Sequence, residues 1–214
     1  MSRRPNILIV MTDHQRGDTV LEEHPCRTPN VSRLAREGLT FAETHCPSPH
    51  CCPSRATFMT GLYPSRHGVW NNICNAQALS RGLAEGVRTW SEDLAEAGYR
   101  LHWSGKWHVS VTESPKDRGW EEGLVSCDAR AHHGQPWEWY QRLAGQPEPA
   151  ERGEGQILRP GYGAYALYGT RRENPASHDE RVVAEAAEAV GRLSRAREPW
   201  VVYAGLVGPH DPYF

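Results

Sequence analysis

Residues 6–12 read Asn6-Ile7-Leu8-Ile9-Val10-Met11-Thr12, and the polar residues Asp13 and His14 follow them directly. A run that is almost wholly apolar and rich in β-branched side chains predicts a strand buried on both faces, as in a parallel sheet. Ligands of open α/β sheets gather at the carboxyl ends of strands, so we expect chemistry at the polar residues 13–18.

Further strands and helices alternate along the chain. Thr89 and Glu92 form a capping-box pattern at the start of one helix. The hydrophobic patterns predict helices over residues 28–38, 54–60, 89–98 and 179–196, and further strands over residues 39–44, 99–104 and 200–207. This alternation indicates an α/β domain with a mainly parallel sheet. Residues 129–176 are rich in Gly and Pro with scattered aromatic residues, which predicts an irregular insertion.

Composition excludes several classes of protein. The chain has 214 residues, enough for one sizeable domain, and its 24 basic and 26 acidic residues give a net charge of −2. A chain with this charge balance has no overall positive electrostatic potential that would attract nucleic acid. The longest aliphatic run, residues 7–11, is far shorter than the roughly 20 residues of a membrane span and too short for a signal peptide. We therefore expect a cytoplasmic protein whose six cysteines are thiols.

The densest motif follows the first predicted helix. It reads Cys51-Cys52-Pro53-Ser54-Arg55-Ala56-Thr57-Phe58-Met59-Thr60-Gly61. This segment resembles the signature of the sulfatase family, Cys-x-Pro-Ser-Arg followed by a short helix and Gly, and residues 63–68 also resemble the family's downstream segment. The alternative is a pair of buried cysteines at a helix start. A structural zinc site is disfavoured because Cys46, Cys51 and Cys52 lack its paired spacing.

The resemblance implies that a formylglycine-generating enzyme oxidises Cys51 to formylglycine. A thiolate would leave a covalent adduct that water must displace, whereas an aldehyde hydrate carries two hydroxyl groups on one carbon. One attacks the sulfur of the ester, and deprotonation of the other releases sulfate. Arg55, one helical turn after Cys51, is expected to stabilise charge at this catalytic group.

The polar residues after the first strand extend the resemblance. In sulfatases the strand resembles Asn-Ile-Leu-x-Ile-x-x-Asp, which implies that Asp13 and the modified Cys51 bind a divalent metal. Calcium is the expected ion, with Mg²⁺ and Mn²⁺ as alternatives. His14 stands where many sulfatases carry a second Asp, so its role stays open. Without the resemblance, Asp13 reads equally as a helix cap.

Two later loops also match the family. Gly105-Lys106-Trp107-His108 resembles its Gly-Lys-x-His loop, which implies that Lys106 binds the sulfate and that His108 hydrogen-bonds the formylglycine hydroxyl or the ester. Residues 208–212 resemble its Pro-His-x-Pro loop, so His210 is expected to bind sulfate and protonate the leaving alkoxide. The alternatives are a solvated lysine beside a packed tryptophan and an exposed histidine in a Pro-rich turn.

The resemblance implies the alkaline phosphatase-like fold of sulfatases and hydrolysis of small-molecule sulfate esters. Residues 1–214 are expected to be the N-terminal part of the catalytic domain, lacking its remainder and the C-terminal subdomain. We expect this stretch alone to bind metal poorly and turn over little substrate. Alternatives are a phosphonate monoester or phosphodiester hydrolase of the same superfamily and a non-catalytic binding module. The particular ester and the oligomeric state stay open.

Overall fold

A four-stranded parallel sheet forms the centre of the computed structural model, which describes residues 4–21, 23–74, 77–126 and 178–210, with short pieces between 142 and 168. The strands lie in the order β1-β6-β2-β3, and every neighbouring pair is parallel. Their bounds are β1 Ile7–Met11, β6 Trp200–Gly205, β2 Arg100–Lys106 and β3 Glu121–Ser126. The predicted α/β class with a mainly parallel sheet is confirmed.

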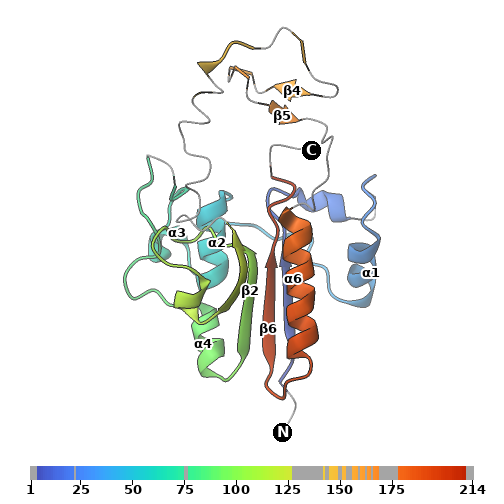
Figure 1. Cartoon of the computed structure of the whole chain (residues 1–214), viewed down its shortest axis with the longest axis vertical. Helices are drawn as coiled ribbons and strands as arrows, with labels where there is room; N and C mark the ends of the chain where they lie inside the picture. The colour runs from blue at the N-terminus through green and yellow to red at the C-terminus, as the bar shows by residue number, and fades with distance from the viewer. Residues whose placement is uncertain are drawn as a thin grey trace.

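Helices cover both faces of this sheet (Figure 1). Helix α6 (His178–Leu193) packs on β2 and β6, and helices α2 (Cys51–Thr60) and α4 (Trp90–Glu96) lie on the opposite face. The described residues also form α1 (Pro29–Glu37), α3 (Pro64–His67) and the 3₁₀ turns η1 (Gly17–Val20) and η2 (Pro115–Arg118). The capping box between Thr89 and Glu92 is present at the start of α4, as predicted.

Aromatic side chains fill the core between the sheet and helices α2 and α4. Trp103 stacks on Tyr203 with ring centroids 3.7 Å apart, and Trp107 and Trp120 each meet Trp103 edge-on at 5.1 Å. All four are buried. Trp103 and Tyr203 lie within β2 and β6, and Trp107 directly follows β2, so this cluster packs the core up to the carboxyl end of β2.

Two details of the expected fold were wrong, and one strand was missed. Residues 39–44 form no strand, because Leu39 and Phe41 are 79% and 76% exposed and bury no apolar face. Strand β1 is buried on one face only: it is the edge strand of the described sheet, and Leu8 and Val10 point to solvent. Strand β3 begins with two charged residues, and for that reason its pattern gave no strand signal.

The predicted insertion over residues 129–176 lies mostly outside the described residues. Within it the structure describes a short antiparallel pair, β4 (Ile157–Leu158) and β5 (Ala166–Tyr168). Among the helices in the described part of the chain, none combines the length and apolar character that a membrane span requires.

Candidate active site

The ends of three parallel strands and the start of one helix meet at a single point. Asp13 follows β1, Lys106 ends β2, and His210 follows β6, while Cys51 is the first residue of α2. Parallel strands place their carboxyl ends at the same edge of a sheet, so segments far apart in sequence contribute to one site.

Cys51 lies at the centre of this arrangement. Its Sγ is 3.6 Å and 3.7 Å from the two carboxylate oxygens of Asp13, and 3.5 Å from Nε2 of His14. A ring nitrogen of His210 completes a group with His14 and Cys51 whose ligand atoms all lie within 4.8 Å of one another. The thiol is only 7% exposed.

Asp13 binds two buried cations. Lys106 Nζ donates to its Oδ2, and Arg55 Nη2 lies 3.8 Å from the same oxygen. Burial by itself would raise the pKa of Asp13, but Lys106 and then Arg55 outweigh it, so that pKa lies below its ordinary value. Asp13 is therefore a carboxylate at neutral pH.

Burial raises the pKa of the Cys51 thiol above its usual range. Lys106 favours the thiolate, whereas the negative charge of Asp13 disfavours it. An unmodified Cys51 is consequently a protonated thiol at neutral pH and a weak nucleophile. Its neighbour Cys52 is buried away from these polar groups, and burial raises its pKa to about 12.

Arg55 is held by the sheet rather than by Cys51. Its Nη1 donates to the Lys106 carbonyl oxygen at 2.9 Å and to the Tyr203 hydroxyl oxygen at 3.1 Å. The Tyr203 hydroxyl in turn donates to the sulfur of Met11 at 3.1 Å. Tyr203 is thus a positioning residue that the sequence reasoning missed, although a hydroxyl inside a buried strand signals the need for a polar partner.

The loop after β6 is anchored at two points. The backbone N–H groups of Val207 and Gly208 donate to the Asp179 carboxylate at 2.8 Å and 2.7 Å, and the Asp13 N–H donates to the Gly208 carbonyl oxygen at 3.2 Å. This loop carries His210, whose ring stacks on His14 with centroids 4.0 Å apart. Asp179 at the start of α6 therefore positions His210, and sequence reasoning missed it because the contact is tertiary.

His108 contacts a cysteine other than Cys51. Its Nε2 lies 3.6 Å from Sγ of Cys74, and its backbone has a φ of 56°. His14 has a similar φ of 62°, and histidine adopts this left-handed conformation more readily than most residues. The structure thus brings Asp13, Cys51, Arg55, Lys106 and His210 together, and the role of His108 stays a prediction.

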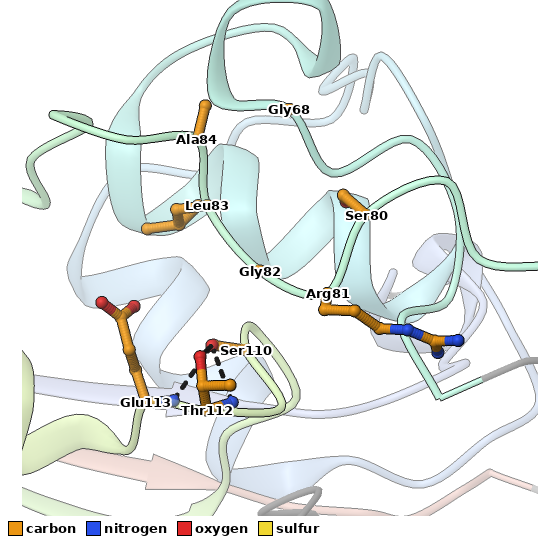
Figure 2. A pocket seen from close by; sticks show the side chains of 9 residues that line it. All are labelled: Gly68, Ser80, Arg81, Gly82, Leu83, Ala84, Ser110, Thr112 and Glu113. Carbon is orange, nitrogen blue, oxygen red and sulfur yellow. Dashed lines mark hydrogen bonds between the residues drawn. The ribbon is translucent and has the colours of Figure 1, made fainter.

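Two cavities lie near the carboxyl ends of the strands. One of about 440 Å³ borders the site through His14 and Pro209, and its other lining residues are Gln15, Arg16, Thr19, Cys26 and Thr28. The other, of about 410 Å³, is lined by Gly68, residues 80–84, Ser110, Thr112 and Glu113. Figure 2 shows that Ser110 turns its hydroxyl to the neighbouring Thr112 and Glu113 in this second cavity. Of the two cavities, only the first is lined by a residue that contacts Cys51, namely His14.

The donor atoms around residue 51 do not match the expected calcium ion. Within the described ranges they are the carboxylate of Asp13, the imidazoles of His14 and His210, and the sulfur of Cys51. Calcium takes about six to eight oxygen ligands, whereas imidazole and thiolate favour later transition metals. These residues alone therefore do not form a calcium site.

A family comparison now identifies the class of protein. The sulfatase family model matches residues 5–214, so the chain belongs to the sulfatase family. Choline-sulfatase of Rhizobium meliloti (strain 1021) is 29% identical over 98% of this chain. That alignment covers 39% of choline-sulfatase, so the chain spans about two-fifths of this relative's length.

Solved structures show the same fold. A 2-O GAG sulfatase matches with a TM-score of 0.61 and 22% identity, over 97% of this chain and 36% of that one. The phosphonate monoester hydrolase of Agrobacterium radiobacter matches with a TM-score of 0.63 and 22% identity, over 98% and 42%. The expected alkaline phosphatase-like fold of sulfatases is confirmed by these neighbours.

Proposed function

We propose that the protein hydrolyses sulfate esters and that residue 51, converted to formylglycine, is its nucleophile. Residues 1–214 then provide the N-terminal part of the catalytic domain. The observation that carries the proposal is the convergence of Asp13, His14 and His210 on the buried Cys51 sulfur. Membership of the sulfatase family supports the same reaction.

The charge of the site suits a small anion. Lys106 and Arg55 are 2% and 4% exposed, and Asp13 is the carboxylate that both approach. Together these three groups carry one net positive charge, which attracts a monoanionic sulfate ester.

Each site residue has a role in this proposal. The formylglycine hydrate supplies the attacking hydroxyl and a second hydroxyl whose deprotonation releases sulfate. Lys106 and Arg55 balance the negative charge on the sulfate oxygens, and His108 hydrogen-bonds the ester or the hydrate. His210 protonates the leaving alkoxide, which is general-acid work suited to imidazole.

A divalent cation assists this reaction in the proposal. The sulfatase family suggests a divalent metal. Asp13 and residue 51 are the ligands expected from the sequence. The described donors do not match calcium, and the proposed roles of Lys106, Arg55 and His210 do not require a metal ligand at those side chains.

Kinetics on matched variants test the proposal. The protein, expressed at its full natural length with a formylglycine-generating enzyme, is assayed on aryl sulfates and on phenylphosphonate monoesters. We expect the sulfate to be the better substrate, with Cys51→Ala abolishing turnover. The matched control is Cys52→Ala, because Cys52 is equally a buried cysteine of α2 but faces the core.

Three results would contradict the proposal. Full turnover by Cys51→Ala would exclude residue 51 as the nucleophile. Faster hydrolysis of the phosphonate would identify a phosphonate monoester hydrolase, and no turnover of either ester by the converted protein would favour a binding module.

A further inference from the structure

Helix α2 carries residue 51 at its first position, where a helix cannot satisfy its own backbone. The first N–H groups of a helix have no acceptor inside it. In α2 the Ser54 N–H donates to the His50 carbonyl oxygen at 3.0 Å, Pro53 has no N–H, and the His50 side chain makes no cap. Among the residues that open the helix, Cys51 and Cys52 therefore have N–H groups that need acceptors from other segments.

The side chain of Asn72 supplies one of these acceptors. The Cys52 N–H donates to Asn72 Oδ1 at 3.1 Å, across 20 positions of sequence. The backbone of the next residue, Ile73, hydrogen-bonds the Cys52 sulfur. Cys52 is 0% exposed, so water cannot replace the acceptor if Asn72 is lost. Two consecutive residues thus hold both the backbone and the side chain of the residue next to Cys51.

Asn72 is itself held in place by its neighbours in sequence. Val69 and Ile73 are fully buried and belong to the same core cluster as Cys52. Asn71 closes the loop, because its side chain bonds the backbone of residues 77 and 79. A substitution at residue 72 can therefore remove the acceptor for Cys52 and leave these contacts of the loop in place.

We propose that Asn72 is a positioning residue that fixes the first turn of α2 and thereby directs the side chain of residue 51 at Asp13. Cys51 directly precedes the Cys52 N–H, so a shift of that group moves Cys51 Sγ relative to Asp13 Oδ1, which lies 3.6 Å away. A displacement of about 1 Å in a reacting group can slow a reaction about 100-fold. This inference rests on the proposed function, since it takes residue 51 as the nucleophile.

Kinetics of Asn72→Leu and Asn71→Leu test this role. Both changes replace an amide side chain by an apolar one of similar size, and Asn71 is the matched control because its contacts lie within its own loop. The full protein is assayed on an aryl sulfate, and each rate is divided by the fraction of residue 51 that is formylglycine. We expect Asn72→Leu to lower kcat at least about tenfold and to change KM less than about threefold, whereas Asn71→Leu keeps kcat within about twofold.

Asn72→Asp separates the two ends of the amide. Aspartate keeps the Oδ1 acceptor for the Cys52 N–H and loses the NH₂ donor. At saturating substrate, where repulsion of the anionic ester does not limit the rate, its kcat should be at least about fivefold above that of Asn72→Leu. A kcat as low as in Asn72→Leu would overturn the proposal, because the reaction would then depend on the NH₂ group. Equal kcat values in Asn72→Leu and Asn71→Leu would overturn it as well.

Hydrogen exchange gives a readout that needs no catalysis. Circular dichroism first verifies that each variant is folded, and exchange is then resolved to single residues. Asn72→Leu should speed exchange of the Cys52 amide at least about tenfold, and Asn71→Leu should leave it unchanged. An unchanged Cys52 amide in Asn72→Leu would overturn the proposal. The expected exchange pattern in a converted protein that hydrolyses no ester would instead refute the proposed function alone.

Discussion

Removal of the Asp13 charge should destabilise the protein more than removal of its partner Lys106. In Asp13→Asn, the cations of Lys106 and Arg55 stay buried side by side, at 2% and 4% exposure, without their shared carboxylate. Loss of one partner from a buried ion pair costs about 3–5 kcal/mol of unfolding free energy. Lys106→Met leaves Asp13 with Arg55 at 3.8 Å, so we expect about 1–3 kcal/mol, as for one unsatisfied buried group.

Urea unfolding followed by tryptophan fluorescence measures both losses. A chelator is present, so that metal binding does not add to the stability of the parent protein. With a slope of about 2 kcal/mol per molar urea, Asp13→Asn should lower the midpoint by about 2 M. The double variant Asp13→Asn/Lys106→Met should be more stable than Asp13→Asn, because it removes one uncompensated charge. This electrostatic account would be refuted if Lys106→Met lowered the free energy of unfolding more than Asp13→Asn does. It would also be refuted if the double variant were less stable than both single variants.

Three further predictions concern the frame around the site. Gly105→Ala should cost more than about 3 kcal/mol of unfolding free energy, because Gly105 has a φ of +98° and an added Cβ would meet the β6 backbone. Gly86→Ala is the control: its φ is +74° but the space around it is open, so it should cost only about 1–2 kcal/mol. Asp179→Ala should lower the free energy of unfolding by about 1.5–3 kcal/mol and lower kcat, because the N–H groups of residues 207 and 208 lose their acceptor. An unchanged kcat would show that this loop does not contribute to catalysis. Burial lowers the pKa of His67 below 6.5, so the folded protein binds a proton at this ring less readily than the unfolded chain does. The free energy of unfolding should therefore fall as the pH drops from about 6.5 through the folded pKa. An NMR titration that gives this ring a pKa at or above 6.5 would contradict this.

Much of the fold could be predicted from local patterns. Strands β1, β2 and β6 and helices α1, α2, α4 and α6 each carry an apolar run, a periodic stripe or a cap. Residues 39–44 show the limit of such patterns, because apolar residues form a strand only where a neighbouring strand and a core accept them. On α6 the buried positions are Val182, Ala186, Ala189 and Leu193, whereas the equally apolar Val183 is half exposed, because the register of a helix depends on what packs against it.

The site could be predicted in part, because some of its residues occur in local sequence patterns. The residues Asp13, Cys51 and Lys106 occur in short motifs at the ends of predicted elements, so their convergence followed from the parallel sheet. Tyr203 and Asp179 lie within a strand and a helix and act through contacts with other segments, which no local pattern encodes. His14 stands directly after Asp13, yet only its contact with the Cys51 sulfur marks it as a ligand candidate.

The mass of residue 51 in the active protein tests the central claim most directly. Protein that hydrolyses an aryl sulfate is digested, and the peptide that contains residues 51–55 is analysed by mass spectrometry. Our account predicts an aldehyde or its hydrate at residue 51, an intact thiol at residue 52, and turnover that rises in proportion to the converted fraction. Full activity with an unmodified thiol at residue 51 would contradict it.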